Sequence, residues 1–464
     1  MTILWAVLGF SLLIGVLVTI HEWGHFAVAR FFNVKVLTFS IGFGRAIYKK
    51  QRGETQYQIG LIPLGGYVKF LDERVDSVAE HEKARAFNQQ SVYKRFAIVL
   101  AGPIINLIFA WLLFAVINMI GVSNLKPLFE TPTNNSPLAS AMTDLDGDHQ
   151  AWWLVEVDHQ PVSSWPRVQQ AVLQGLVHDK ASVTLSLQPF GTKADEQVNN
   201  QLVELPLSGL DLNNVKSNWL GELGFRPKPP NLAPLIDEVL DGSPAFKAGL
   251  QSGDRITAVN GQVINDWQAL VRFVRLHPNE SHLISYQRNQ AQYDVMVRFE
   301  GVEQSGEQIG RLGASVDQTQ LQQSEYYAIE RYGVLGAFEQ GLHQSVNLLN
   351  MTLVMFKKML FGEVGLAHLS GPLSIADFSG QALQSGFISF LSLMALLSLS
   401  LGVLNLLPIP MLDGGHLMYY LVEMVRGRPV SERVEEIGYR IGLTLIVGLT
   451  ILAFTNDLVR ITNG

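Results

Sequence analysis

Residues 1–26 read MTILWAVLGFSLLIGVLVTIHEWGHF, an apolar run that ends in ionisable side chains. The first twenty residues carry no charge, and about 20 apolar residues in a helix cross the hydrocarbon core of a bilayer. No Lys or Arg precedes the run and no clear small-residue cleavage site follows it, so it differs from a cleaved signal peptide. We therefore expect residues 1–26 to form a retained transmembrane helix.

The run ends at His21-Glu22-Trp23-Gly24-His25, an HExxH motif. Histidines four residues apart on a helix face the same way and can share a Zn²⁺ ion, and the glutamate beside them can act as a general base. His and Glu at the end of a membrane span are energetically costly and tend to be functional. The alternative interpretation is a polar helix end at the membrane interface.

Composition restricts what this chain of 464 residues can be. It is 48% hydrophobic and only 16% charged, which is too apolar for an ordinary soluble protein. The net charge of −7 provides no basic field, so a nucleic-acid partner has no electrostatic support. Cysteine is absent, which excludes disulfides, thiolate zinc sites and iron–sulfur clusters, so any metal must be held by His, Asp or Glu.

Three more uncharged runs are candidate spans: Phe96 to Ile120, Phe378 to Leu412 and the shorter Ile441 to Asn456. They predict transmembrane helices over 96–120, 386–413 and 437–457. The alternative is a set of buried helices in a large soluble protein.

Charge predicts the orientation of these spans. Loop 27–95 holds 12 Lys and Arg against 6 Asp and Glu, whereas residues 121–377 hold 17 against 28. By the positive-inside rule, loops 27–95 and 414–436 lie in the cytoplasm. Both termini and the long acidic segment then lie outside, which is the periplasm in a Gram-negative cell.

A catalytic zinc usually takes three protein ligands, so the two histidines need another donor. Asp413, in NLLPIPMLDGGHL, is the first charged residue after 35 uncharged positions. The predicted first and third helices both run from outside to inside, which places His21, His25 and Asp413 at their inner ends. The three side chains can therefore meet near the cytoplasmic face.

The segment between the second and third spans has short β-branched runs broken by Pro, Gly and Asn, which predicts small β-rich domains. Ser136-Pro137 and Ser243-Pro244 open similar units, so we expect one domain over 122–222 and a second over 223–310. The segment that begins at Ser243, SPAFKAGLQSGDRITAVNGQVI, resembles a PDZ domain, and the segment that begins at Ser136 departs from that pattern.

GELGF, from Gly221 to Phe225, is the best candidate for a PDZ-type loop that holds a terminal carboxylate. The alternative is a plain strand-opening turn. Beyond the two domains, residues 324–377 predict an amphipathic region that either lies on the membrane surface or packs against protein.

A zinc-bound water beside a glutamate base can attack a peptide carbonyl. If the substrate is a membrane helix, it must first unwind locally, because a helix hides its carbonyls in its own hydrogen bonds. The segment YQIGLIPLGGYVK, 57–69, predicts two short strands around a turn that contains Gly65 and Gly66. Its apolar content predicts a re-entrant hairpin that dips into the bilayer, with an edge that can pair with an extended substrate.

Asn405 lies two helical turns before Asp413, and Pro408 and Pro410 between them break the regular ladder of hydrogen bonds. Its amide can therefore bond a freed backbone group of the substrate. The alternative is an asparagine that caps or packs a helix.

An HExxH on the first transmembrane helix, an LDG on a later one and a PDZ insertion between them resemble the site-2 protease family of intramembrane zinc metalloproteases. The resemblance covers essentially the whole chain. It implies that His21, His25 and Asp413 bind Zn²⁺ and that Glu22 is the base. It also implies the re-entrant hairpin and a substrate role for Asn405, and it includes Gly102, Pro103 and Asn106 in the family's Gly-Pro-x-x-Asn element.

The resemblance further implies an inner-membrane endopeptidase that cuts single-span membrane proteins in or near their transmembrane segments. Expected substrates are an anti-sigma factor of the sigma-E envelope stress response, already trimmed outside by another protease, and leftover signal peptides. The PDZ domains then act as a steric filter or capture peptides.

The rival hypothesis is a non-catalytic adaptor whose PDZ domains bind periplasmic carboxyl termini. A transporter is a third option, but the chain lacks the internal symmetry of many such folds.

Overall fold

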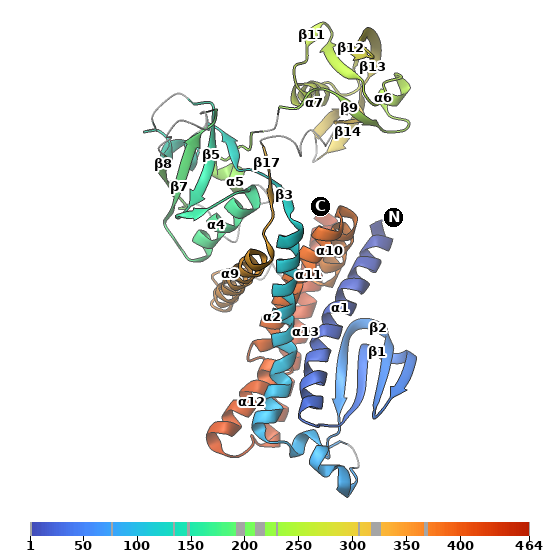
Figure 1. The fold of residues 1–464 in the computed structure, drawn as a ribbon, viewed down its shortest axis with the longest axis vertical. Helices are drawn as coiled ribbons and strands as arrows, with labels where there is room; N and C mark the ends of the chain where they lie inside the picture. The colour runs from blue at the N-terminus through green and yellow to red at the C-terminus, as the bar shows by residue number, and fades with distance from the viewer. Residues whose placement is uncertain are drawn as a thin grey trace. The chain divides into compact units, whose positions relative to one another are not determined.

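Figure 1 shows the fold as a computed structural model. The structure describes residues 2–75, 78–132, 135–145, 149–191, 200–208, 219–228, 231–304, 307–316, 326–365 and 370–463. The chain divides into two units, one containing residues 1–122 and 331–464 and the other most of residues 123–330.

In the described part of the chain, four helices are long and apolar enough to cross a membrane. They are α1 (Thr2–Phe31), α2 (Val92–Ile120), α11 (Phe387–Leu406) and α13 (Glu432–Asn463). The four expected spans are therefore present as helices, and the chain is a membrane protein by this pattern and length. Each of them begins or ends several residues away from the expected bounds.

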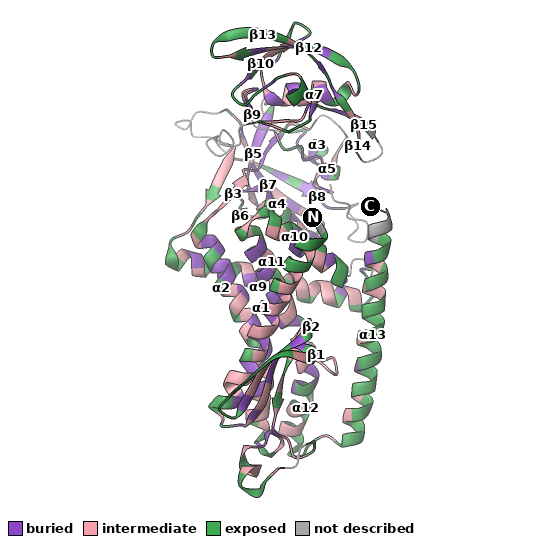
Figure 2. Ribbon diagram, turned by 90° about the vertical axis from the view of Figure 1, so that its right-hand side faces the viewer, coloured by how far each residue is buried: buried purple, intermediate pink, exposed green. Residues whose placement is uncertain are grey.

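The centre of the first unit is built by α1, α2 and α11, which lie side by side in Figure 1. Their buried side chains form one apolar cluster that includes Leu13 and Leu17 of α1, Phe114 of α2, and Met394 and Leu399 of α11. The helix α13 contributes little to this cluster and is largely exposed along its length (Figure 2). Because its exposed side chains are mostly apolar, they suit contact with lipid.

The third span ends earlier than expected, at Leu406, and Asp413 is instead the first residue of a separate helix, α12 (Asp413–Arg426). Pro408 and Pro410 lie in the connecting turn, where proline cannot continue the helical ladder. The turn is tight: a Cβ atom at Gly414 would lie 2.0 Å from the Leu407 carbonyl oxygen. The sequence pattern missed this break because the apolar run continues through the turn.

Two long strands follow α1, namely β1 (Val36–Arg52) and β2 (Thr55–Phe70). Phe39 of β1 pairs with both Tyr57 and Val68, so the two ends of β2 lie on opposite sides of the first part of β1. The expectation of two strands of 57–69 paired with each other is therefore wrong, because β1 lies between them. The segment around Val68 forms an edge of this sheet.

The region expected over 324–377 contains α9 (Val334–Leu360) and the start of α10 (Pro372–Ser385). One side of α9 packs on α2: a Cβ atom at Gly341 would lie 2.9 Å from the Ala115 nitrogen, and the Trp111 indole donates to the Phe338 carbonyl at 2.9 Å. Outside this contact, α9 exposes Leu342, among other apolar residues. Thus α9 is amphipathic and uses one side for packing within the unit.

The second unit contains two β-rich domains, and in the first a sheet has the order β4-β5-β7-β8 with β6 beside β5. The strands are β4 (Leu128–Glu130), β5 (Ala151–Val157), β6 (Gln160–Pro161), β7 (Ser182–Pro189) and β8 (Gln201–Pro206). The helices are α3 (Pro137–Ala141), α4 (Trp165–Val177) and α5 (Trp219–Leu223). A further pair, β3 (Val122–Leu125) with β17 (Tyr327–Glu330), joins the two ends of the inserted segment.

The second β-rich domain has a four-stranded sheet of order β11-β10-β12-β13 and two two-stranded sheets, β9 with β16 and β14 with β15. The strands are β9 (Ile236–Val239), β10 (Arg255–Val259), β11 (Gln262–Val263), β12 (Ser281–Arg288), β13 (Ala291–Arg298), β14 (Glu300–Gln304), β15 (Glu307–Arg311) and β16 (Ala314–Val316). Its helices are α6 (Pro244–Lys247) and α7 (Trp267–Leu276). Its buried cluster runs in sequence from Leu232 to Leu312.

The boundary between the two domains differs from the expected 222/223. Phe225 packs edge-on against the rings of Phe129 and Trp165 in the first domain, and the Lys228 amide donates to the Leu128 carbonyl. The segment GELGF therefore closes the first domain instead of opening the second. Its position follows from packing that no local pattern encodes.

The two domains share a local arrangement, in which a serine that caps a short helix near the start of the domain packs against a glycine near its end. Ser136 and Ser243 each cap a short helix, accepting a hydrogen bond from the amide three residues later. A Cβ atom at Gly224 would lie 2.2 Å from the Ser136 hydroxyl, and one at Gly313 would lie 2.3 Å from the Ser243 Cβ. Gly313, in Arg311-Leu312-Gly313-Ala314, is thus the counterpart of Gly224 in GELGF, a part of the repeat that the sequence comparison missed.

Candidate metal centre

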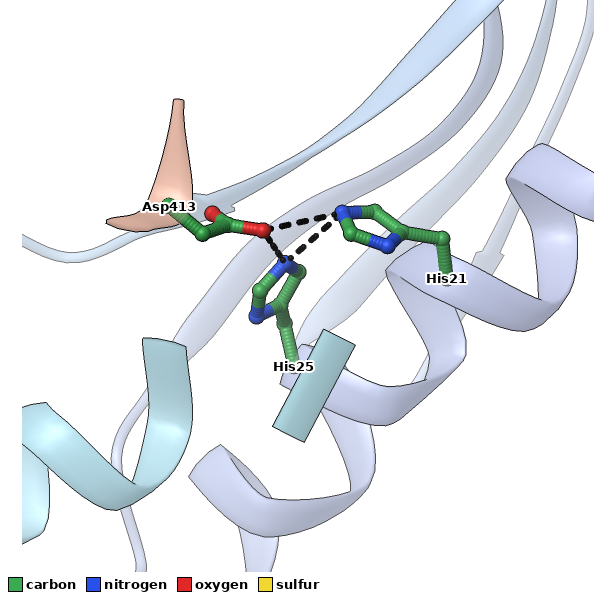
Figure 3. Close-up of side chains that lie close together, drawn as sticks. All are labelled: His21, His25 and Asp413. Carbon is green, nitrogen blue, oxygen red and sulfur yellow. Dashed lines mark hydrogen bonds and ion pairs between the residues drawn. The ribbon is translucent and has the colours of Figure 1, made fainter. Parts of the chain in front are cut away.

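Three side chains from two distant parts of the chain converge in the first unit (Figure 3). The Nε2 atoms of His21 and His25 lie 3.3 Å apart, and Asp413 Oδ2 lies 3.1 Å from the first and 3.5 Å from the second. Both histidines are buried, with exposed fractions of 9% for His21 and 8% for His25. The predicted meeting of the HExxH motif and Asp413 is therefore present in the geometry.

The donor set fits a zinc ion. Zinc bonds to nitrogen and oxygen are about 2.0–2.2 Å long, so neighbouring ligand atoms of a tetrahedral site lie about 3.3 Å apart. The three measured separations, 3.1, 3.3 and 3.5 Å, bracket that value. Asp413 Oδ2 is buried without a hydrogen-bond donor, as expected of an atom whose lone pair faces a cation site. Three protein donors also leave a fourth position for water or substrate.

The histidine ring nitrogens that face away from this point have their own partners. His25 Nδ1 donates to the backbone carbonyl of Ile98 at 2.8 Å, which leaves Nε2 with a free lone pair. His21 Nδ1 lies 3.1 Å from the Asn106 side-chain amide, and the Asn405 amide nitrogen lies 3.5 Å from His21 Nε2. The Ile98 contact could not be found from the sequence, because every residue has a backbone carbonyl.

Helix α2 approaches the two imidazoles closely because Gly102 has no side chain. A Cβ atom there would lie 2.3 Å from His25 Nε2 and 2.9 Å from His21 Cε1. Gly24, between the two histidines, makes the reciprocal approach, since its Cβ would lie 2.6 Å from the Ala101 carbonyl oxygen. Of the Gly-Pro-x-x-Asn element, Gly102 and Asn106 contact the histidines, and Pro103 lies between them in the helix.

Glu22 lies at the edge of the β1–β2 sheet. The Val68 backbone amide hydrogen-bonds its carboxylate, and a Cβ atom at Gly66 would lie 3.2 Å from Glu22 Cγ. Gly66 therefore permits close contact between the sheet edge and the helix that carries the histidines. Gly65 instead lies against the ring of Phe43, so of the two predicted glycines only Gly66 reaches the site.

Asp413 is suited to bind a cation as a carboxylate. Its Oδ2 atom faces Nε2 of both His21 and His25, so the three atoms can share one ion. Pro408 and Pro410 do not contact the histidines in any described interaction; they shape the turn that delivers Asp413.

The second β-rich domain contains a separate groove of about 390 Å³. One wall is the helix α7, with Trp267, Leu270 and Val274, and the other is the chain from Gly310 to Ser315. This wall includes Gly313, the counterpart of Gly224. The predicted loop GELGF does not line this groove; the chain from Gly310 to Ser315 does, and its Leu312-Gly313 pair repeats Leu223-Gly224 of GELGF.

Comparison with known proteins places the chain in a family. Residues 9–449 match the model of peptidase family M50. The chain is 37% identical to the regulator of sigma-E protease RseP of Escherichia coli and to that of Salmonella typhimurium, in each case over 99% of this chain and 100% of the relative. It is also 37% identical to a Vibrio cholerae protein whose assigned name proposes a zinc metalloprotease, over 99% of both chains.

Among solved structures, the PDZ domain of the SdrC-like protein from Listeria monocytogenes matches 20% of this chain and 96% of its own length, with 16% identity and a TM-score of 0.17. The family assignment comes from the full-length matches, whose range spans residues 21–25 and residue 413 of this chain. The chain belongs to peptidase family M50, the site-2 zinc metalloproteases.

Proposed function

We propose that this protein is an intramembrane zinc endopeptidase that hydrolyses peptide bonds in or near the transmembrane segments of single-span membrane proteins. The observation that carries the proposal is the convergence of His21, His25 and Asp413 at tetrahedral separations beside Glu22, within a unit built from apolar helices. In this proposal the two imidazoles and the carboxylate hold the zinc ion.

A bound zinc ion would acidify water and polarise a peptide carbonyl. Glu22 accepts the proton of the attacking water and returns it to the nitrogen of the leaving amine. The Val68 amide, which hydrogen-bonds the Glu22 carboxylate, keeps the base directed at one place. The Ile98 carbonyl holds His25 in the tautomer that presents Nε2 inward.

Substrate must reach this site as an extended strand, since a helix shields its carbonyls. The edge of the β1–β2 sheet near Gly66 and Val68 is beside Glu22, and an extended segment could add to it as a further strand. The Asn405 amide, 3.5 Å from His21 Nε2, lies close enough to the proposed metal position to bond the reacting carbonyl. Both features support the sequence-based substrate roles of Gly66 and Asn405.

We place the protein in the inner membrane, with both termini and the two β-rich domains in the periplasm and the metal centre near the cytoplasmic face. The charge difference between loop 27–95 and residues 121–377 supports this orientation. The sigma-E relatives support an anti-sigma factor as a substrate, and remnant signal peptides have the same single-span form.

The test uses purified full-length protein and a single-span model substrate without an outer domain, labelled at its cytoplasmic end. Wild type is expected to cleave it, whereas Glu22→Gln and chelator-treated wild type are not. Glu80→Gln, an exposed carboxylate distant in sequence from the motif, is the matched control and retains cleavage. Equal cleavage by all samples would exclude the enzyme assignment. Cleavage that is lost in Glu22→Gln but persists in chelator-treated wild type would exclude a catalytic metal.

We propose that the two β-rich domains are PDZ domains that exclude substrates with bulky outer domains. Attaching a folded domain to the outer end of the model substrate should then reduce cleavage. The groove beside Gly310–Ser315 supports a second role, capture of a free carboxyl terminus. If that role holds, a fluorescent peptide with a free carboxylate would bind more tightly than its amidated form. If the domains act only as a filter, the two peptides would bind equally.

The adaptor hypothesis remains testable in the same experiments. An adaptor would bind the peptide but would show no dependence of substrate cleavage on Glu22. The family assignment and the zinc-compatible geometry favour the enzyme.

A further inference from the structure

We propose that Asn106 is a positioning residue for the metal centre, and that its side-chain carbonyl accepts the Nδ1 proton of His21. The inference rests on the proposed function, since it assigns a partner to a proposed zinc ligand. Asn106 does not lie among the three converging donors, so its role is exerted through His21.

The surroundings of Asn106 hold it in place. It is fully buried in α2, one helical turn after Gly102, and its side chain lies 3.1 Å from His21 Nδ1. Its backbone carbonyl accepts a hydrogen bond from the buried Ser398 hydroxyl of α11 at 2.8 Å. Asn106 thus links α11, α2 and the first histidine of α1 at one level of the helix bundle.

The required protonation of His21 identifies what its partner must do. Nε2 of His21 faces Asp413 and His25, so it is the nitrogen that offers a lone pair to a metal. A neutral imidazole then carries its proton on Nδ1, which becomes a hydrogen-bond donor. Its neighbour must therefore be an acceptor.

The amide of Asn106 can supply that acceptor after an exchange of its two ends. In the structure its nitrogen faces His21 Nδ1, which brings two donors together, while its oxygen is buried without a partner. The two ends of an amide are almost identical in shape, so their assignment follows from the hydrogen bonds they make. Rotation by 180° directs the unpaired Oδ1 at the Nδ1 proton and removes the mismatch.

Asn106 differs from the partner of the other histidine. His25 uses the Ile98 backbone carbonyl, which no side-chain substitution removes. Among the interactions of the described residues, Asn106 is the side chain that contacts the outward nitrogen of a proposed ligand. Outer partners of metal-bound histidines fix the ring and its tautomer, and their loss typically weakens metal binding 10- to 100-fold.

The experiment measures zinc affinity in the purified full-length protein by competition with a chromophoric chelator. Three variants are compared with wild type. Asn106→Leu removes the polar group at similar volume, and Asn106→Asp can accept but not donate. Asn118→Leu is the matched control, because Asn118 is also a buried asparagine of α2 with an unpaired amide nitrogen, far along the helix from the histidines. Visible absorption of the cobalt-substituted proteins reports ligand geometry independently of catalysis.

We expect N106L to bind zinc about 10- to 100-fold more weakly and to change the cobalt spectrum. N106D should keep both properties close to wild type, and N118L should leave them unchanged. Unchanged affinity in N106L, equal loss in N118L, or loss in N106D would overturn the inference. If N106L does not fold, N106D alone decides, because a side chain that cannot donate retains affinity only where an acceptor is needed. Wild type without stoichiometric zinc would instead refute the proposed function itself.

Discussion

The substitution Gly102→Ala tests the metal centre with a single methyl group. The added Cβ would lie 2.3 Å from His25 Nε2 and 2.4 Å from its Cε1, whereas real Cβ atoms essentially never approach a heavy atom closer than 3.0 Å. The ring must move by at least about 0.7 Å, but metal–ligand distances tolerate only about 0.2 Å. Helix α1 and helix α2 cannot separate easily, because Gly24 packs on Ala101 beside the same contact.

Adding atoms to a tightly packed site typically costs about 1–3 kcal/mol. If displacement of His25 relieves that strain, zinc affinity falls between about fivefold and 150-fold, since about 1.4 kcal/mol is a factor of ten. The assay is zinc content and chelator competition on the purified protein, followed by substrate cleavage. Gly15→Ala is the control on α1, because a Cβ there meets nothing within 4 Å. Zinc affinity within twofold of wild type in a folded Gly102→Ala protein would refute the reasoning.

Three further predictions concern the parts around the site. Arg288→Ala leaves the fully buried Asp254 carboxylate without its bidentate partner and should destabilise the second β-rich domain by about 3 kcal/mol, seen as an earlier calorimetric transition. Burial would raise the pKa of Glu330, but hydrogen bonds from Ser163 and Arg167 hold that pKa below its ordinary value. The ionised Glu330 therefore stabilises the fold fully above the ordinary carboxyl pKa of about 4.3, and this contribution is lost as the pH falls. Arg167→Gln should make the melting temperature less dependent on acid pH. Asp457→Ala removes the acceptor for the amides of Gly371 and Ser374 and should lower stability by about 1–2 kcal/mol in thermal melts, whereas unchanged melting would show that α10 does not depend on this cap.

Patterns that act over short distances along the chain were sufficient for much of this architecture. The four apolar runs became helices, because length and hydrophobicity decide whether a segment suits a bilayer. The i, i+4 spacing alone places His21 and His25 on one helix face. The expected convergence with Asp413 also agrees with the geometry, because charge counts were enough to assign both to the same ends of their spans.

Breaks inside apolar segments were harder to predict. The third span was extended to Asp413, whereas the structure ends it at Leu406 and starts α12 at Asp413. No charged residue interrupts the segment from Leu406 to Leu412, so the backbone restrictions of Pro408 and Pro410 mark the turn. Two prolines within three residues end the helix here even though the surrounding residues stay apolar.

Pairing between distant segments was decided by the tertiary structure. The position of β1 between the two ends of β2, and the packing of Phe225 on Phe129, depend on contacts that leave no periodic signal. The outer partners of the histidines belong to the same class: the Ile98 carbonyl carries no side-chain identity, and Asn106 gains its role only when α2 lies against α1.

Residue types and spacings along this chain therefore determined the four apolar helices, that the protein is membrane-embedded, and which side chains can hold a metal. The folded arrangement alone decided which backbone and amide groups surround those side chains, where each helix stops, and which strand presents an edge to Glu22. The physical reason is range: helix formation and membrane insertion depend on consecutive residues, whereas the orientation of a ligand depends on helices that meet only after folding.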